Sequence, residues 1–120
     1  MSKKMLSTRV NYFKFSELVK TDTGLLNYPN TPEQGYNLVN LWYFLNRVRF
    51  RLRSYIIVNS CFRTVEVNNA VGGVPDSYHT KGRAADIYTS PDKMDELFDI
   101  LKSENVLELI RYKTFIHFAI

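Results

Sequence analysis

Cysteine and histidine are scarce in this chain of 120 residues, which contains one cysteine and two histidines. The single cysteine, Cys61, excludes an internal disulfide and also a zinc site built from several cysteines. No apolar run is long enough to cross a bilayer, so we expect no insertion into a membrane. The N-terminal MSKKML is basic but lacks the apolar stretch of a signal peptide. We therefore expect synthesis in the cytoplasm without a signal peptide, and action outside the membrane only after release by another agent.

The remaining composition is that of an ordinary globular protein, with 45% hydrophobic and 23% charged residues. The length suits one domain spanning residues 1–120, and we expect a monomer. Cys61 follows the apolar run YIIVNS, which predicts a buried, unreactive side chain. The alternative, a catalytic thiol, needs a nearby base that the sequence does not show.

Positive charge is concentrated in the first half of the chain. The net charge is +4 and the pI is about 9.2, and residues 1–60 carry nine of the 16 Lys/Arg but three of the 12 Asp/Glu. Such a surface can approach a polyanion, either nucleic acid or an anionic cell wall. Arginines at 47, 49, 51 and 53 fall on two faces of a helix, Arg47/Arg51 and Arg49/Arg53, which favours solvated flanks over one binding stripe. Because no recognition motif accompanies them, we expect no nucleic-acid partner.

Helical spacing is clearest after Thr31-Pro32-Glu33-Gln34, where Thr31 can cap the helix and Gln34 completes a capping box. The apolar residues that follow predict a long core helix: Leu38, Leu41, Trp42, Leu45, Val48 and Leu52. Trp42 fits this core better than a platform for a ligand. Shorter helices are predicted from Ser16, after Thr64, and from Ser90-Pro91.

Three segments predict strands. SYIIVNS reads as a buried central strand, RAADIYT as a strand of small residues, and VLELIRY with TFIHFAI as a closing hairpin. A two-residue turn at Lys113-Thr114 pairs Ile110 with His117 and Glu108 with Ala119. The fold class is therefore α+β, with helices packed on a mostly antiparallel sheet.

The stretch SYHTKGRAAD contains one of the two histidines. Alternation on the following strand places Asp86 beside the small Ala84, and Gly82 lets the chain fold His79 back toward Asp86. With His117 on the last strand, these residues form a candidate zinc set with one position left open. The alternatives remain open at this point: an exposed loop histidine, a core histidine bonded to backbone, and an aspartate paired with Arg83 or Lys81.

SYHTKGRAAD matches the pattern Ser-x-His-x-x-Gly-x-Ala-x-Asp at every fixed position. This pattern resembles the zinc-binding signature of the D-Ala-D-Ala carboxypeptidase family, which also includes vancomycin-resistance dipeptidases and phage L-Ala-D-Glu endolysins. NSCFRTVEVNNAVGGVPDSYHTKGRAADI is similar to the corresponding segment of its small single-domain branch. The resemblance covers roughly the whole chain and implies a fold like that of the hedgehog and D-Ala-D-Ala peptidase domains.

Position by position, the resemblance implies that His79, Asp86 and His117 bind zinc. It implies that Arg63 holds a substrate carboxylate or carbonyl, a role that suits the planar guanidinium. Ser77 matches a serine near the site that hydrogen-bonds substrate or supports a ligand. Asn69 and Gly72-Gly73 match residues that shape the loop.

The chain also departs from the family pattern. Phe62 replaces a tyrosine and Cys61 a glycine, and no acid lies in RYKTFIH, where the family commonly places its proton-transferring Glu or Asp. Tyr112 stands roughly where the small branch has its glutamate. The predicted register places Glu108 diagonal to His117, so Glu108 is the candidate general base, with Tyr112 or no base at all as alternatives.

We interpret the sequence as a zinc-dependent peptidase of phage or prophage type that hydrolyses peptidoglycan stem peptides, as a carboxypeptidase or an endolysin-type endopeptidase. The alternative is a non-catalytic zinc-containing member that binds cell wall or a partner.

Overall fold

The computed structural model describes residues 11–120, so the basic stretch 1–6 lies outside the described part. The elements follow one another as α2 (Phe15–Leu18), α3 (Pro32–Leu52), β1 (Ile57–Ser60), α4 (Val65–Ala70), the 3₁₀ turn η1 (Tyr78–Lys81), β2 (Ala84–Tyr88), the 3₁₀ turn η2 (Pro91–Lys93), α5 (Met94–Ser103), β3 (Glu108–Arg111) and β4 (Ile116–Ala119). The α+β class is confirmed. Within residues 11–120, no helix combines the length and the hydropathy needed to cross a membrane.

The sheet has the order β1-β2-β4-β3, and every neighbouring pair is antiparallel. The prediction that SYIIVNS forms a central strand is wrong, because β1 lies at one edge. Val58 of β1 and the preceding Ile56 are buried in the hydrophobic core that the sheet shares with the helices, and this burial does not require a strand on both sides of β1. The strands at the centre are β2 and β4, which carry Asp86 and His117 of the candidate zinc set.

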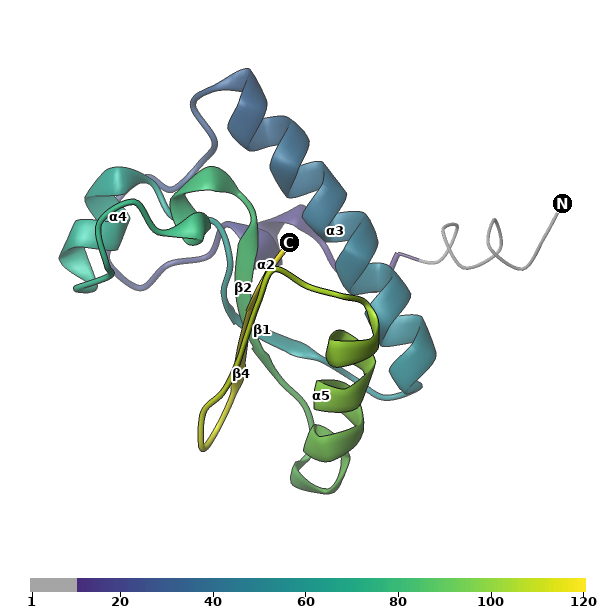
Figure 1. The fold of residues 1–120 in the computed structure, drawn as a ribbon. Helices are drawn as coiled ribbons and strands as arrows, with labels where there is room; N and C mark the ends of the chain where they lie inside the picture. The colour runs from purple at the N-terminus through teal and green to yellow at the C-terminus, as the bar shows by residue number, and fades with distance from the viewer. Residues whose placement is uncertain (1–10) are drawn as a thin grey trace, which may run out of the picture.

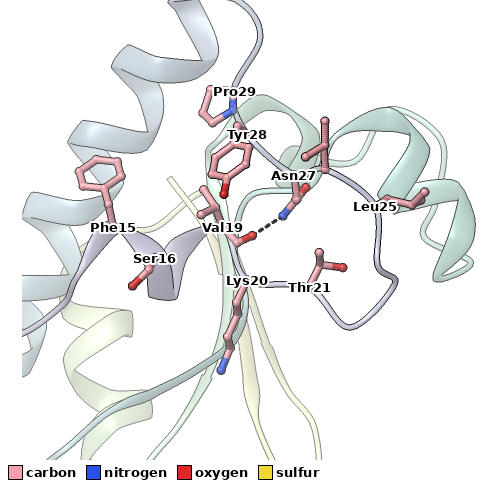
Figure 2. A pocket seen from close by; sticks show the side chains of 10 residues that line it. Phe15, Ser16, Val19, Lys20, Thr21, Leu25, Asn27, Tyr28 and Pro29 are labelled. Atoms are coloured by element: carbon pink, nitrogen blue, oxygen red, sulfur yellow. Dashed lines mark hydrogen bonds between the residues drawn. The ribbon is translucent and has the colours of Figure 1, made fainter.

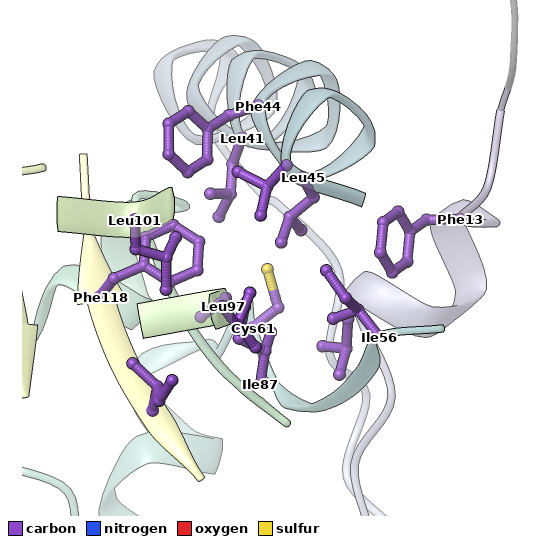
Figure 3. Packing of buried hydrophobic residues seen from close by; sticks show 14 of the residues in the cluster. Phe13, Leu41, Phe44, Leu45, Ile56, Cys61, Ile87, Leu97, Leu101 and Phe118 are labelled. Carbon is purple, nitrogen blue, oxygen red and sulfur yellow. The ribbon is translucent and has the colours of Figure 1, made fainter. Parts of the chain in front are cut away.

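The long helix α3 covers one side of the sheet together with α5 (Figure 1). Thr31 caps α3 and Gln34 completes the capping box, as predicted. The predicted apolar face is buried, apart from the half-buried Trp42, whose indole N–H donates to the Phe13 carbonyl at 2.8 Å. Figure 3 shows the packing of the buried core, with the Cys61 sulfur among leucine, isoleucine and phenylalanine side chains. Cys61 is buried as predicted, and burial raises the pKa of its thiol.

The short helices agree with the sequence only in part. Thr64 caps α4, as predicted. At Ser90-Pro91 the chain first makes the 3₁₀ turn η2, and the α-helix begins at Met94. The first short helix begins at Phe15, one residue before the predicted Ser16.

The closing hairpin has the predicted register. Ile110 pairs with His117 and Glu108 with Ala119, and the Tyr112 N–H donates to the Phe115 carbonyl at 2.9 Å across the Lys113-Thr114 turn. In Figure 1 the hairpin is the yellow ribbon that extends away from α3. Because β4 pairs with β2 on its other side, Asp86 lies directly opposite His117.

The arginines of α3 split between two faces, as predicted. Arg47 and Arg51 both bind Glu104 at the end of α5, at 3.1 and 2.9 Å. Arg49 lies on the other face, with its guanidinium 4.3 Å from the centre of the Tyr12 ring. Two of the four arginines are therefore engaged by the carboxylate that follows α5, which leaves them less available to a polyanion.

Candidate metal centre

Three side chains from three different elements meet on the face of the sheet away from α3. One ligand atom each of His79, Asp86 and His117 lies within 4.8 Å of the others. His79 comes from η1, Asp86 from β2 and His117 from β4. The structure therefore brings together the three residues that the sequence predicted as a metal site.

His79 is fixed in direction by its surroundings. Its Nδ1 lies 2.6 Å from the Cys61 carbonyl, so Nδ1–H donates there and Nε2 points to Asp86 Oδ1 at 3.4 Å. Its backbone N–H donates to Ser77 Oγ at 3.1 Å, and Gly82 ends the turn at φ 75°, where an added Cβ would lie 2.8 Å from the Gln34 carbonyl. At 3% exposed, His79 is not an exposed loop histidine.

Asp86 and His117 form the closest pair of the cluster. His117 Nδ1 lies 2.8 Å from Asp86 Oδ1, as expected from their cross-strand pairing. Burial alone would raise the pKa of Asp86, but its contacts with His117 and His79 outweigh burial and lower that pKa to about 2. The same hydrogen bond to Asp86 raises the pKa of His117, against burial and with the help of Glu108.

Glu108 contacts the other nitrogen of the His117 ring. Its Oε1 lies 2.8 Å from His117 Nε2, so the two ring nitrogens of His117 each face a carboxylate. Tyr112 lies further along the hairpin, with its ring stacked on Phe115 at 4.7 Å between centroids. The structure thus places Glu108 beside His117, as the predicted register requires.

Arg63 lies against the same cluster. Its Nε donates to Ser60 Oγ at 3.0 Å, its Nη1 donates to Asn68 Oδ1 at 3.1 Å, and its Nη2 lies 3.7 Å from Asp86 Oδ2. Burial lowers the pKa of Arg63, and the Asp86 charge opposes this. The guanidinium is therefore held in place with one nitrogen directed toward the candidate ligands.

A cleft of about 370 Å³ opens over these residues. Its acids are Asp76, Asp86 and Glu108. Asp76 is bound by Lys81 at 2.7 Å, so Lys81 is not the partner of Asp86. Arg83 is not its partner either, because its Nε donates to the Ile120 carbonyl at 2.7 Å. Of the three acids of the cleft, Asp86 is a candidate ligand and Asp76 is paired with Lys81, so Glu108 is the remaining acid beside the candidate ligands.

A second hollow, of about 500 Å³, lies between α2 and the loop that leads to α3 (Figure 2). Its lining is mostly apolar, with Phe15, Leu25 and Tyr28 among the exposed side chains. Asn27, the buried amide there, donates to the carbonyls of Val19 and Phe62 and is fully engaged in holding the loop. This hollow contains no group of metal-binding side chains among residues 11–120, so the chemistry points to the smaller cleft.

The sequence missed two residues of this region. Ser60 and Asn68 both contact Arg63, whereas the resemblance assigns the shaping of the loop to Asn69. Asn69 is exposed, whereas Asn68 is buried and donates to the Val74 carbonyl at 2.9 Å. The helix that Thr64 caps offered a signal for Asn68. Its apolar residue Val67 predicts which side of the helix faces inward, and Asn68 lies next to Val67.

The fold and the cluster define a class: an α+β domain whose antiparallel sheet presents a His–Asp–His set on an open face. The sequence model of the family described as Peptidase M15 matches residues 11–119. The chain therefore belongs to the peptidase M15 family, whose members are zinc peptidases that act on peptidoglycan. A search of curated proteins found no match.

The three side chains fit a zinc ion in their donor chemistry. Two imidazole nitrogens and one carboxylate are typical zinc ligands, and three protein ligands leave a position open, as in catalytic sites. The second nitrogen of His79 donates to a carbonyl, and that of His117 faces the Glu108 carboxylate, which is how metal-binding histidines are usually oriented.

Proposed function

We propose that this chain is a zinc-dependent peptidase that hydrolyses peptidoglycan stem peptides, with His79, Asp86 and His117 as the metal ligands. The observation that carries this proposal is the convergence of three ligand atoms within 4.8 Å from three separate elements. The family to which the chain belongs supports the reaction class and the substrate class. When bound, zinc supplies Lewis-acid chemistry: it polarises a carbonyl oxygen and makes water more acidic.

Three residues around the candidate ligands then have roles. Arg63 binds an oxygen of the peptide through Nη2, which faces the ligand set while Nε and Nη1 are engaged elsewhere. Ser77 supports His79 by accepting its backbone N–H, which favours a supporting role over direct substrate contact. Glu108 accepts the proton of the attacking water and returns it to the amine that leaves when the peptide bond breaks.

The role of Glu108 is tested by two substitutions that separate its two possible tasks. Glu108→Gln keeps an amide oxygen that can accept from His117 Nε2–H but cannot take a proton, so we expect zinc affinity to stay and hydrolysis to fall about 100-fold or more. Glu108→Ala removes both, so zinc affinity should also fall about tenfold. Asp76→Asn is the matched control, because Asp76 lines the same cleft but binds Lys81, and it should leave activity unchanged. Full activity in Glu108→Gln would exclude Glu108 as the base and turn attention to Tyr112.

The second candidate function is a non-catalytic member of the family that binds cell wall. It is motivated by the stretch Tyr112–Ile116, which contains no acid before His117. The zinc-loaded protein should be incubated with purified peptidoglycan, with and without a chelator, and new amino termini counted. Chelator-sensitive release of amino termini supports the peptidase, and retention on peptidoglycan without release supports the binding protein.

A further inference from the structure

Asn68 is a buried residue of α4 whose side chain contacts Arg63. It is 2% exposed, and both ends of its amide are engaged: Oδ1 accepts from Arg63 Nη1 at 3.1 Å, and Nδ2 donates to the Val74 carbonyl at 2.9 Å. Its own backbone carbonyl accepts from the Gly73 N–H at 2.8 Å. Asn68 therefore joins the guanidinium to the loop whose Val74 lines the cleft.

Gly73 provides the room for this arrangement. A Cβ built on Gly73 would lie 2.0 Å from Asn68 Oδ1 and 3.0 Å from Arg63 Nη1. Real Cβ atoms do not approach so closely, so any larger residue would push the amide and the guanidinium apart. The backbone at Gly73 lies so close to Asn68 that a residue with a side chain does not fit there without a shift.

Two contacts together fix how the guanidinium is presented. Ser60 Oγ occupies Nε, and Asn68 Oδ1 accepts one of the two protons of Nη1, which leaves Nη2 beside Asp86 Oδ2 at 3.7 Å. Because Nε is occupied, a substrate carboxylate cannot use the side-on pair of Nε and Nη2. Arg63 therefore meets the substrate through Nη2, close to the candidate ligands.

We propose that Asn68 is a positioning residue that sets the direction of Arg63, and that Gly73 is required at its position to leave room for this contact. The proposal rests on the function proposed above, since Arg63 is there the residue that binds the peptide. Asn68 touches neither the substrate nor the metal ligands; it acts through Arg63.

The test compares Asn68→Ala with Asn69→Ala. Asn69 is the next residue of the same helix and has the same side chain, but it is exposed. With the zinc-loaded protein and a synthetic stem pentapeptide, Asn68→Ala should raise KM about tenfold with a smaller change in kcat. Asn69→Ala should match the wild type, and bound zinc should remain at one per chain in both.

A double substitution shows whether Asn68 acts through Arg63. In an Arg63→Ala background, Asn68→Ala should change kcat/KM less than about twofold, because the group it positions is already gone. Asn68→Asp, which keeps an acceptor for Nη1, should recover most of the lost substrate binding. Equal losses with and without Arg63, or an Asn68→Ala variant as active as Asn69→Ala, would overturn the proposal.

A measurement without turnover separates this proposal from the proposed function. In ¹H–¹⁵N spectra of the protein at low temperature, an Arg63 Nη1–H signal should be visible in the wild type and in Asn69→Ala and lost to solvent exchange in Asn68→Ala, because Asn68 Oδ1 is the acceptor for Nη1. Persistence of that signal in Asn68→Ala refutes the positioning role even if no stem peptide is cleaved. Absence of hydrolysis by the wild type refutes the peptidase, and the spectra still decide the role of Asn68.

Discussion

Two carboxylates flank His117, one from each strand beside β4, and they differ in how firmly they are held. Asp86 on β2 and Glu108 on β3 both lie 2.8 Å from a ring nitrogen of His117. Asp86 also lies 3.4 Å from His79 Nε2 and 3.7 Å from Arg63 Nη2, and its side chain is 13% exposed. Glu108 is 41% exposed and has His117 as its hydrogen-bonded partner among residues 11–120.

The difference follows from the positions of the strands. β2 has a hydrogen-bonded neighbour on each side, whereas β3 is an edge strand with β4 alone beside it. A carboxylate on the inner strand is surrounded by cationic and hydrogen-bonding groups, which keep it ionised and suit it to holding a metal. A carboxylate on the edge strand remains in contact with solvent while it contacts the histidine. In the function proposed above, the same contact distance serves two different tasks.

The largest expected effect comes from removing the inner carboxylate. Asp86→Ala should reduce zinc affinity at least 1000-fold, because it removes a ligand and also the partner of both histidines. The effect of Glu108→Ala should remain about tenfold, since only the orientation of His117 is lost. Zinc per chain after dialysis against a weak chelator measures both.

His117→Ala should also abolish stoichiometric zinc. Asp95→Ala is the control for loss of an acid, because Asp95 is an exposed carboxylate paired with Arg111, outside the cluster. If Asp86→Ala or His117→Ala retained one tightly bound zinc, the ligand set would be wrong.

An intermediate effect is expected from pH in the metal-free protein. The pKa of His117 is raised above 6.5, so its contribution to stability is complete below pH 6.5 and is lost as the pH rises through the raised value. The pKa of Asp86 is lowered from 3.8 to about 2, so its contribution is present above pH 3.8 and is lost as the pH falls toward 2. The pair therefore stabilises the metal-free fold most between these limits.

In the presence of a chelator, raising the pH from 6 to 8.5 should lower the Tm by on the order of 5 °C. Asp86→Asn should remove more of this dependence than Glu108→Gln, because the hydrogen bond to Asp86 is the largest cause of the His117 shift. Circular dichroism melts in a pH series measure it. A Tm that rises over this range, or an unchanged fall in His117→Asn, would contradict the assignment.

The sequence predicted the local features of this comparison better than those that depend on tertiary packing. Local rules were enough for the capping box at Thr31 and for the hairpin register, because turn length and strand alternation fix pairing. That register is enough to predict Glu108 beside His117. The spacing of the residues alone did not establish the ligand set, which depended on the resemblance to the family.

The errors concern features that depend on tertiary packing. An apolar run such as that before Ser60 is the same whether neighbouring strands or helices bury it, so the edge position of β1 could not be read from it. The choice between Asn68 and Asn69 depends on which side of a six-residue helix faces inward. The Cys61 carbonyl that orients His79 is a backbone group, so no pattern of side chains in the sequence predicts this contact.

The smallest expected effect comes from removing the serine that holds the backbone of His79. Ser77 Oγ caps η1 and accepts from the His79 backbone N–H, so Ser77→Ala should lower zinc affinity about fivefold, the usual cost of a lost cap. Ser77→Thr keeps the hydroxyl and should stay close to the wild type. If Ser77 instead contacts the peptide, Ser77→Ala will raise KM and leave zinc affinity unchanged. The cap acts on the backbone of one candidate ligand, whereas Asp86 contacts the other two candidate ligands directly. The zinc affinity lost in Asp86→Ala, divided by that lost in Ser77→Ala, therefore measures how much more the inner carboxylate contributes to the metal site than the loop does.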